Sequence, residues 1–200
     1  MEDRKTYFDR HAARWDEELG YAEKADKLAE VTRWFDITKG DRILDVGTGT
    51  GVLLPFLAEA IGPSGVLVAM DFSYPMLEKA KHCNLERRWV LVNATVAAMP
   101  FRSNLYDRVT CFSALPHFPD KTGALSEMVR VLRKGGWLFI AHLHSVEEMN
   151  AFHQKVGGAV GHDRLPSPHD MGSLMEGCGC HEFSFVNQPG KFLARARKIS

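Results

Sequence analysis

The sequence lacks the features that would place a chain in a membrane or a secretory pathway. No apolar run approaches the roughly 20 residues that a membrane-spanning helix needs, and the first ten residues, MEDRKTYFDR, contain no apolar core of a signal peptide. Repeats, low-complexity tracts and linkers are also missing. A chain of 200 residues predicts one domain, residues 1–200. We therefore expect a cytoplasmic protein with no membrane partner.

Excess charge and paired cysteines are missing as well. Lys and Arg together number 25, as do Asp and Glu, so the formal net charge is zero. A neutral chain has no long-range attraction for polyanions, so we expect no nucleic-acid partner. The four cysteines form no C-x-x-C pair, which favours free thiols in a cytosolic setting. The oligomeric state stays open between monomer and homodimer.

A glycine-rich segment, RILDVGTGTGVLLPFL at residues 42–57, is the most informative stretch. An apolar run, a loop with glycines at every second position and a further apolar pattern predict a buried parallel strand that turns into a helix over residues 50–61. Gly47, Gly49 and Gly51 would let a ligand approach the main chain. The dinucleotide pattern G-x-G-x-x-G requires glycine where this chain has Val52. This disfavours an NAD-dependent oxidoreductase.

Asp45 narrows the choice of ligand. A carboxylate two residues before the first glycine would repel a pyrophosphate and attract an ammonium or sulfonium cation. S-adenosylmethionine has such a cation and no phosphate. The segment from Asp45 to Gly51 resembles motif I of the class I S-adenosylmethionine-dependent methyltransferases, including the small-molecule enzymes of quinone pathways. The resemblance implies a three-layer α/β/α sandwich: a seven-stranded, mostly parallel, Rossmann-like sheet with a C-terminal antiparallel hairpin.

Further motifs follow in the family's order. Asp71 comes 20 residues after Gly51, at the end of a predicted second strand, where an acid can accept both ribose hydroxyls. DFSYPML resembles the family's D-x-S-x-x-M-L, which implies Asp71 on the ribose, Phe72 on adenine, and Met76 or Leu77 closing the pocket. A helix is expected over residues 75–86 and a third strand over residues 89–92.

The third motif departs from the family pattern. NATVAAMPF resembles G-D-A-E-x-L-P-F, yet Thr95 stands where the family has an acid and Ala97 where it has a glutamate. Thr95 would then either face the adenine amino group with its hydroxyl or leave that contact to water, and the Val96 amide would face a ring nitrogen. After a fourth strand over residues 106–113, the main chain of Ser113 and Leu115 is expected near the methionine end.

The expected cofactor-binding residues are Tyr7, Asp45, Gly47, Thr48, Gly49, Gly51, Asp71, Phe72, Met76, Ala94, Thr95, Val96, Ser113 and Leu115.

Residues 1–36 read as helical, with the second helix over residues 22–35. Tyr7, His11 and Trp15 recur every four residues, an aromatic stripe on one helix face. The stripe either packs on the sheet or forms a lid that excludes water from the reaction. Residues 42–141 would form the cofactor-binding core, and residues 142–200 the substrate side and the last strands.

The later elements follow from periodicity. We expect a helix over residues 121–133, a stop at Lys134, Gly135 and Gly136, a fifth strand over residues 137–145, and helices over residues 146–156 and 170–176. The final two strands would meet at a turn in residues 187–190, and the basic positions of the tail would cover the solvent side of an edge strand.

Seven of the nine histidines lie between His117 and His181, and three roles compete for them. His142 and His144 are one strand period apart and would face the same side of the sheet as general bases. His117 is either a third catalytic candidate or a packing residue. A metal site is the second role, but H-x-x-x-H spacing is missing from every predicted element, so no metal is expected. Packing without chemistry is the third.

The sequence therefore predicts a methyltransferase that uses S-adenosyl-L-methionine and transfers its methyl group in line to a small-molecule acceptor. Two alternatives stay open. The departures at Thr95 and Ala97 suit a cofactor-binding module without turnover, and Cys178 and Cys180, with His181, leave room for a methyltransferase of metalloids.

Overall fold

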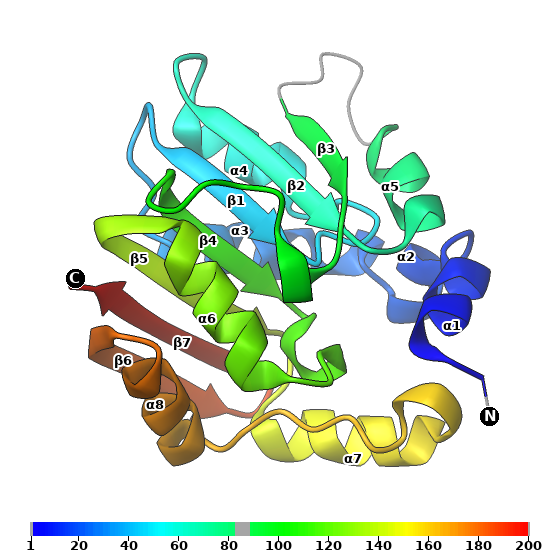
Figure 1. The fold of residues 1–200 in the computed structure, drawn as a ribbon. Coiled ribbons are helices and arrows are strands. Elements are labelled where there is room, and N and C mark those ends of the chain that lie inside the picture. Colours follow the sequence, from blue (N-terminus) through cyan, green and yellow to red (C-terminus); the bar gives the residue numbers. More distant parts are fainter. Residues whose placement is uncertain (1, 83–88, 200) are drawn as a thin grey trace.

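One seven-stranded sheet supports the fold (Figure 1). The computed structural model describes residues 2–82 and 89–199. The strands are β1 (Arg42–Val46), β2 (Val66–Asp71), β3 (Val90–Asn93), β4 (Tyr106–Phe112), β5 (Leu132–His142), β6 (Cys180–Gln188) and β7 (Lys191–Lys198).

Their spatial order is β3-β2-β1-β4-β5-β7-β6. All neighbouring pairs are parallel up to β5, and β7 runs antiparallel to both β5 and β6. The expected mostly parallel sheet with a C-terminal antiparallel hairpin is confirmed. The strand order reverses between β1 and β4, and open α/β sheets bind ligands beyond the carboxyl ends of the strands at such a point.

Helices cover both faces of the sheet. The α-helices are α1 (Arg4–His11), α2 (Trp15–Leu19), α3 (Ala25–Trp34), α4 (Leu54–Ile61), α5 (Tyr74–Ala80), α6 (Lys121–Val131), α7 (Val146–Val156) and α8 (Pro168–Gly177). The short 3-10 turns are η1 (Ala22–Lys24), η2 (Val96–Ala98), η3 (Leu115–His117) and η4 (Gly158–Val160).

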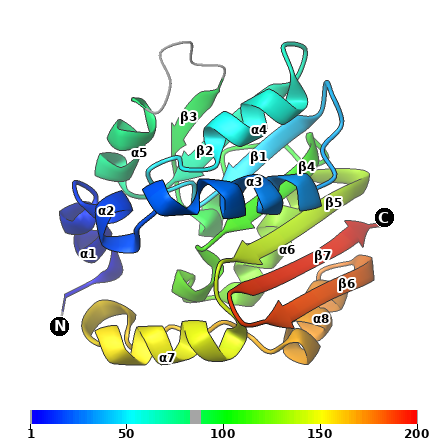
Figure 2. The ribbon, with the colours of Figure 1, turned by 180° about the vertical axis from the view of Figure 1, so that it is seen from behind.

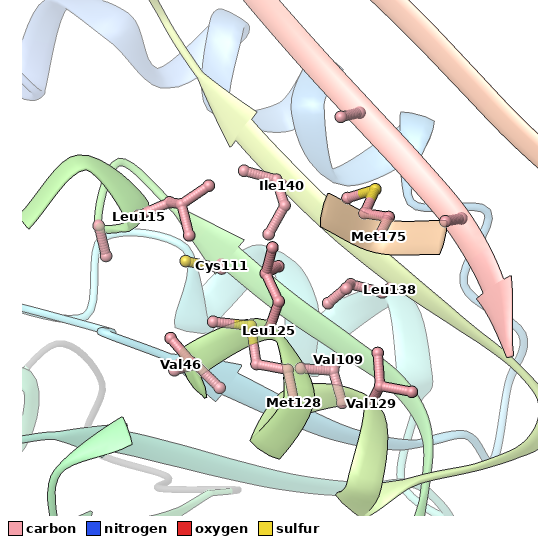
Figure 3. Packing of buried hydrophobic residues seen from close by; sticks show 14 of the residues in the cluster. Val46, Val109, Cys111, Leu115, Leu125, Met128, Val129, Leu138, Ile140 and Met175 are labelled. Carbon is pink, nitrogen blue, oxygen red and sulfur yellow. The ribbon is translucent and has the colours of Figure 1, made fainter. Parts of the chain in front are cut away.

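The helices α6 and α8 lie on one face and α3 and α4 on the other (Figures 1 and 2). Apolar side chains on both faces of the sheet explain why the parallel strands read as nearly continuous hydrophobic runs. On the α6 side, Leu125 and Met128 pack against Val109 and Ile140 of the central strands (Figure 3). The expected α/β/α layering is therefore confirmed.

The N-terminal segment is more broken than its periodicity suggests. The helix α1 ends at His11, and Trp15 begins the separate helix α2, so Tyr7, His11 and Trp15 do not form one stripe on a single helix. The aromatic rings still gather, because Phe8 contacts Trp15 with ring centroids 5.4 Å apart. The expected helix over residues 22–35 is divided into η1 and α3.

Two other boundaries differ from expectation. The helix α4 begins at Leu54, four residues late, and α5 ends at Ala80; the remainder of the helix expected over residues 75–86 lies partly outside the described residues. The helix α7 spans the expected residues because Ser145 and Glu148 form a capping box, in which each side chain accepts from the other's backbone N–H.

The expected stop at residues 134–136 is wrong. The helix α6 ends at Val131, and β5 begins at Leu132, which pairs with Tyr106 of β4 before the register shifts. Gly135 takes a φ of 74° within this irregular start, so the glycines bend a strand here instead of ending a helix. The strand β5 also ends at His142, three residues earlier than expected.

The basic tail was assigned to the wrong environment. The strand β7 lies between β5 and β6 and is not an edge strand. The Arg195 guanidinium lies 5.2 Å from the Trp137 ring centroid, and Lys198, 7% exposed, donates to the carbonyl oxygens of Val129 and Leu132. Lys198 is therefore buried while it caps carbonyls, Arg195 is half-buried on an aromatic ring, and the side chain of Arg197 stays 43% exposed.

Candidate active site

A cavity of about 530 Å³ opens at the carboxyl edge of β1, β2 and β4. Side chains of α1 and α2 close one side of it and those of α7 close another, for example Tyr7, Trp15 and Phe152. Ligand pockets in proteins range over roughly 300–1,000 Å³, so this volume suits a small cofactor together with part of an acceptor.

The glycine loop after β1 brings main chain to the cavity wall. The amides of Gly47 and Thr48 both donate to the Met70 carbonyl, at 2.8 and 3.0 Å, which fixes the loop against β2. Gly47 has a φ of 70°, and a Cβ added there would lie 2.5 Å from the Cβ of Ala114. Only glycine satisfies both demands. The loop can therefore pass close to the end of β4 only because this position has no side chain.

Asp71 lies at the tip of β2 and lines the cavity. Its carboxylate accepts from the Gly49 amide at 2.8 Å and from the Ser73 amide at 2.9 Å. Burial raises the pKa of Asp71 to about 6, against the lowering effect of these two hydrogen bonds. A carboxylate held in place by backbone donors still has free lone pairs for the hydroxyl groups of a ligand.

The prediction that the Asp45 carboxylate faces a ligand cation differs from its observed position. Asp45 is 2% exposed, accepts from the Thr110 hydroxyl at 2.8 Å and does not line the cavity. Burial raises its pKa, and the hydrogen bond from Thr110 opposes that shift. Asp45 therefore lies behind the cavity wall, and its carboxylate does not directly contact a ligand cation in the cavity.

The structure brings most of the expected residues to one cavity. Those that line it are Tyr7, Gly47, Thr48, Gly49, Asp71, Phe72, Met76, Ala94, Thr95, Val96, Ser113, His117 and His144. Four expected residues do not line it: Asp45, Gly51, Leu115 and His142. Gly51 avoids a clash with Ala80 and Leu54, and Leu115 is buried in the core beside Cys111 and Ile140 (Figure 3).

The departure at Thr95 has a structural consequence. Its hydroxyl accepts from the Ala97 amide at 3.3 Å and so caps the turn η2. The Ala94 amide donates to the Asp71 carbonyl at 3.1 Å, which holds this loop beside β2. At the position where the family has an acid, this chain therefore has a side chain that hydrogen-bonds to the backbone of η2.

Ser113 holds the end of β4 in an unusual conformation. Its φ is 53°, in the left-handed region that non-glycine residues rarely adopt. The buried Tyr21 packs nearby; burial raises its pKa to about 12, opposed by a hydrogen bond with Ser113. Strained backbone at the mouth of a ligand cavity is typical of functional positions.

Two hydrogen bonds that the sequence did not predict attach the N-terminal helices to the sheet edge. The Ser73 hydroxyl donates to Asp9 of α1 at 2.6 Å, and the Thr50 hydroxyl donates to Asp16 of α2. Each pair joins residues more than 30 positions apart, and no motif marks them. The aromatic residues were the only sequence signal that this segment packs over the cavity.

The two strand histidines are in different environments. His142 is fully buried, and within the described residues neither of its ring nitrogens has a hydrogen-bond partner; burial lowers its pKa to about 3. His144 follows the end of β5, lines the cavity and stacks on Phe152 at 6.1 Å. The expectation that both face one side from a single strand is wrong because the strand ends between them.

A second group of charged residues includes Arg4, His117 and His153, which also line the cavity. Asp163, 2% exposed, accepts from His117 Nδ1 at 2.7 Å and from Arg4 Nε at 3.1 Å. His153 Nδ1 donates to the Asp163 carbonyl at 3.2 Å. Burial acts to raise the pKa of Asp163, but the hydrogen bonds from His117 and Arg4 outweigh it and lower the pKa. Burial lowers the pKa of His153 to about 4.

Metal and cysteine chemistry find little support in the described part of the chain. It holds no group of three or more His, Cys, Asp or Glu side chains arranged to bind a metal ion. Cys178 and Cys180 lie where α8 meets β6, away from the cavity lining, and are free thiols. Cys83 falls outside the described residues. Over the same described ranges, no helix has the length and hydrophobicity that crossing a bilayer requires.

Comparison with known proteins agrees with this geometry. The Methyltransferase domain family matches residues 44–140. A demethylmenaquinone methyltransferase of Staphylococcus aureus is 41% identical over 107 residues, which are 53% of this chain and 44% of that protein. The chain therefore spans less than half the length of the curated relatives that it matches.

Solved structures show the same fold at low identity. A methyltransferase of Haloferax volcanii, in complex with the Trm112 methyltransferase activator, has a TM-score of 0.81 at 18% identity and covers 100% of both chains. An S-adenosylmethionine-dependent methyltransferase of Methanococcus maripaludis has a TM-score of 0.76 at 21% identity, covering 100% of this chain and 97% of its own.

The fold is Rossmann-like, and its cavity has a carboxylate at the tip of the second strand. Residues 44–140 form a methyltransferase domain, and this match, together with the curated relatives and the solved structures, supports a class I S-adenosylmethionine-dependent methyltransferase family. The cofactor of this family is S-adenosylmethionine, and the residues present fit it: the cavity has room for it, Asp71 lines the wall, and Gly47 leaves the loop open to close approach.

Proposed function

We propose that this protein transfers a methyl group from S-adenosylmethionine to a small, largely apolar acceptor held between the N-terminal helices and α7. The observation that carries the proposal is Asp71, a buried carboxylate fixed by the Gly49 and Ser73 amides on the wall of the cavity. Asp71 would accept the ribose hydroxyls, and Phe72 and Met76 would enclose the adenine. When bound, the cofactor supplies a methyl group on a sulfonium, which is already activated for transfer.

The remaining parts of the chain take roles that follow from this placement. Residues 1–36 act as a lid, because Asp9 and Asp16 bond to hydroxyls at the sheet edge and aromatic side chains of α1 and α2 line the cavity. Residues 42–141 form the cofactor-binding core of a single domain, and residues 142–200 supply the acceptor side. A closed lid excludes water and aligns the acceptor with the methyl group, an effect that contributes roughly 7–11 kcal/mol in favourable cases.

The nature of the acceptor side supports a small molecule. Its wall includes Met149, Phe152 and Val156 of α7, and Phe152 and Val156 are 40% and 42% exposed. Apolar side chains at the mouth suit an acceptor with an apolar body better than a charged polymer. The formal net charge of zero agrees with this choice.

Calorimetry with S-adenosylmethionine, S-adenosylhomocysteine and NAD tests the cofactor. We expect the first two to bind and Asp71→Ala to weaken S-adenosylmethionine at least tenfold, about 1.4 kcal/mol. Glu59→Ala is the matched control, since Glu59 is an exposed acid on α4 away from the cavity. The affinity of this variant for S-adenosylmethionine should be unchanged. A melting curve for each variant verifies folding. Binding of NAD alone would overturn the proposal.

Turnover separates an enzyme from a binding module. The test is release of S-adenosylhomocysteine in the presence of a panel of small hydroxylated, amino and thiol acceptors. The module without turnover gains support from one observation, the use of the Thr95 hydroxyl by the backbone of η2. A protein that binds the cofactor tightly and produces no S-adenosylhomocysteine with any acceptor would favour the module.

A further inference from the structure

His117 differs from the other histidines at the cavity because a buried carboxylate holds it. The Asp163 carboxylate can only accept, so His117 carries its proton on Nδ1, and Nε2 is the basic nitrogen of the neutral ring. Nε2 has no hydrogen-bond partner among the described residues, and it is not enclosed by protein as the His142 nitrogens are. The ring therefore offers an accessible base to the cavity that it lines.

Several contacts keep this pair in place. Arg4 of α1 donates to the same carboxylate, which balances its charge and prevents rotation away from His117. The His117 ring meets Phe8 and His153 edge to face, each with ring centroids 4.9 Å apart. The backbone carbonyl of Asp163 is also bonded to His153. Three separate elements thus fix the ring, as a general base requires.

His144 lacks such support. It is half-buried, and burial lowers its pKa, while within the described residues no carboxylate bonds to it; its neighbour is the Phe152 ring. Burial and the charge of Lys24 lower its pKa against the opposing effect of Glu148, which makes His144 a weaker base, and no hydrogen bond to a carboxylate sets its tautomer. His117 is the better candidate on geometry alone.

We propose that His117 is the general base of this enzyme, that Asp163 is its positioning residue, and that the acceptor is therefore a hydroxyl on an aromatic body. The inference rests on the proposed methyltransferase function. In the step, the hydroxyl proton passes to His117 Nε2, and the oxygen forms a bond to the methyl carbon. The carbon–sulfur bond breaks with its electron pair going to sulfur, which leaves a neutral thioether and an imidazolium paired with Asp163.

The side chains around His117 favour an aromatic acceptor. Phe8 contacts the ring directly, and Phe118 and Tyr7 line the same cavity. Flat apolar surfaces of this kind favour a planar acceptor by offset or edge-to-face packing. An ionisable phenolic hydroxyl also has an acidity that an imidazole can assist.

The test compares two phenols in the same assay. Hydroquinone keeps its proton at pH 7.5, whereas 4-nitrophenol is largely ionised and needs no base. We expect His117→Gln to lower kcat on hydroquinone about 100-fold, the lower end of the usual contribution of a general base, and to change kcat on 4-nitrophenol less than about threefold. Asp163→Asn should lower kcat on hydroquinone about tenfold, with little change in KM, because it disturbs the base and not binding.

A spectroscopic measurement supports the roles without turnover. Nitrogen-15 NMR of the folded protein reports which ring nitrogen of His117 carries the proton, and the signal is assigned by its loss in His117→Gln. We expect the Nδ1–H form in the wild type and loss of that single form in Asp163→Asn. Equal loss on both phenols, a larger loss in His144→Gln than in His117→Gln, or an Nε2–H ring in the wild type would overturn the proposal.

Failure of the methyltransferase function gives a different result. A protein that does not bind S-adenosylmethionine refutes the function itself, whatever the tautomer of His117. A protein that binds the cofactor but methylates neither phenol overturns the acceptor class proposed here and leaves the cofactor assignment standing.

Discussion

The two walls of the cavity are built in different ways. The carboxylate wall comes from the glycine loop and the tip of β2, and it relies on main-chain contacts such as the Gly49 amide on Asp71. The histidine wall is made of side chains from distant parts of the chain, and Arg4 and Asp163 are 159 residues apart. The first wall follows a sequence motif, because backbone geometry is local; the second depends on how the helices pack.

Burial acts with opposite sign on the two walls. It raises the pKa of Asp71 to about 6 and lowers the pKa of His153 to about 4, because burial disfavours the charged form of either kind of group. On both walls, burial therefore shifts a titratable group toward its neutral form. Asp163 differs from these groups, because hydrogen bonds from His117 and Arg4 outweigh burial and lower its pKa.

The largest effect should come from the loop, where the main chain leaves no room. Gly47→Ala combines a left-handed φ with a Cβ at 2.5 Å from Ala114, and we expect a loss of about 2–5 kcal/mol of stability or complete loss of cofactor binding. Gly49→Ala is the matched control, since its φ is 56° but nothing lies within 4 Å of the added Cβ. Chemical denaturation should show a loss of only about 1–2 kcal/mol there. Equal losses would refute the close approach.

An intermediate effect is expected from the buried His142, on the pH dependence of the free energy of unfolding. The pKa of His142 is lowered from 6.5 to about 3, so the unfolded chain takes up a proton that the folded chain refuses, and stability falls as pH drops below 6.5. His142→Leu removes this term and should reduce the loss of unfolding free energy between pH 7.5 and 5 by about 2 kcal/mol. His169→Leu, at an exposed position on α8, is the control. An unchanged acid profile in His142→Leu would contradict the burial.

The smallest effect is the pH dependence of cofactor affinity, which depends on Asp71 in the carboxylate wall. The raised pKa of Asp71 means that its carboxylate gains a proton as pH falls through about 6, and a protonated acid accepts hydroxyl groups less well. We expect S-adenosylmethionine affinity to fall about tenfold between pH 7 and pH 5. Asp71→Asn should bind weakly at both pH values. A wild-type affinity that does not change with pH would show that the ribose does not rely on this carboxylate.

The same group has the opposite effect on folding. Because the folded pKa of Asp71 is higher than its ordinary value of 3.8, its protonation favours the folded state. That stability is fully present below pH 3.8 and is lost as pH rises through about 6. In the ligand-free protein, Asp71→Asn should thus gain stability at neutral pH relative to the wild type, measured by urea unfolding. This trade of stability for binding is common at functional sites.

Sequence alone determined the sheet, the glycine loop and the strand-tip acid. These follow from hydrophobic runs, glycine spacing and a fixed interval between motifs, all of which describe backbone within a few tens of residues. It also identified Asp71, Phe72 and Met76 as residues of one wall, and the cavity lining includes all three. Their roles toward the cofactor stay predictions until binding is measured.

Only the tertiary structure decided which charges and histidines meet. It withdrew Asp45 and His142 from the cavity, ended β5 before His144, buried Lys198 of β7, and joined Asp163 to His117 and Arg4. None of these contacts has a periodicity, because each depends on packing between elements far apart in the chain. Side-chain burial and pairing follow from three-dimensional neighbours, and a one-dimensional pattern does not contain them.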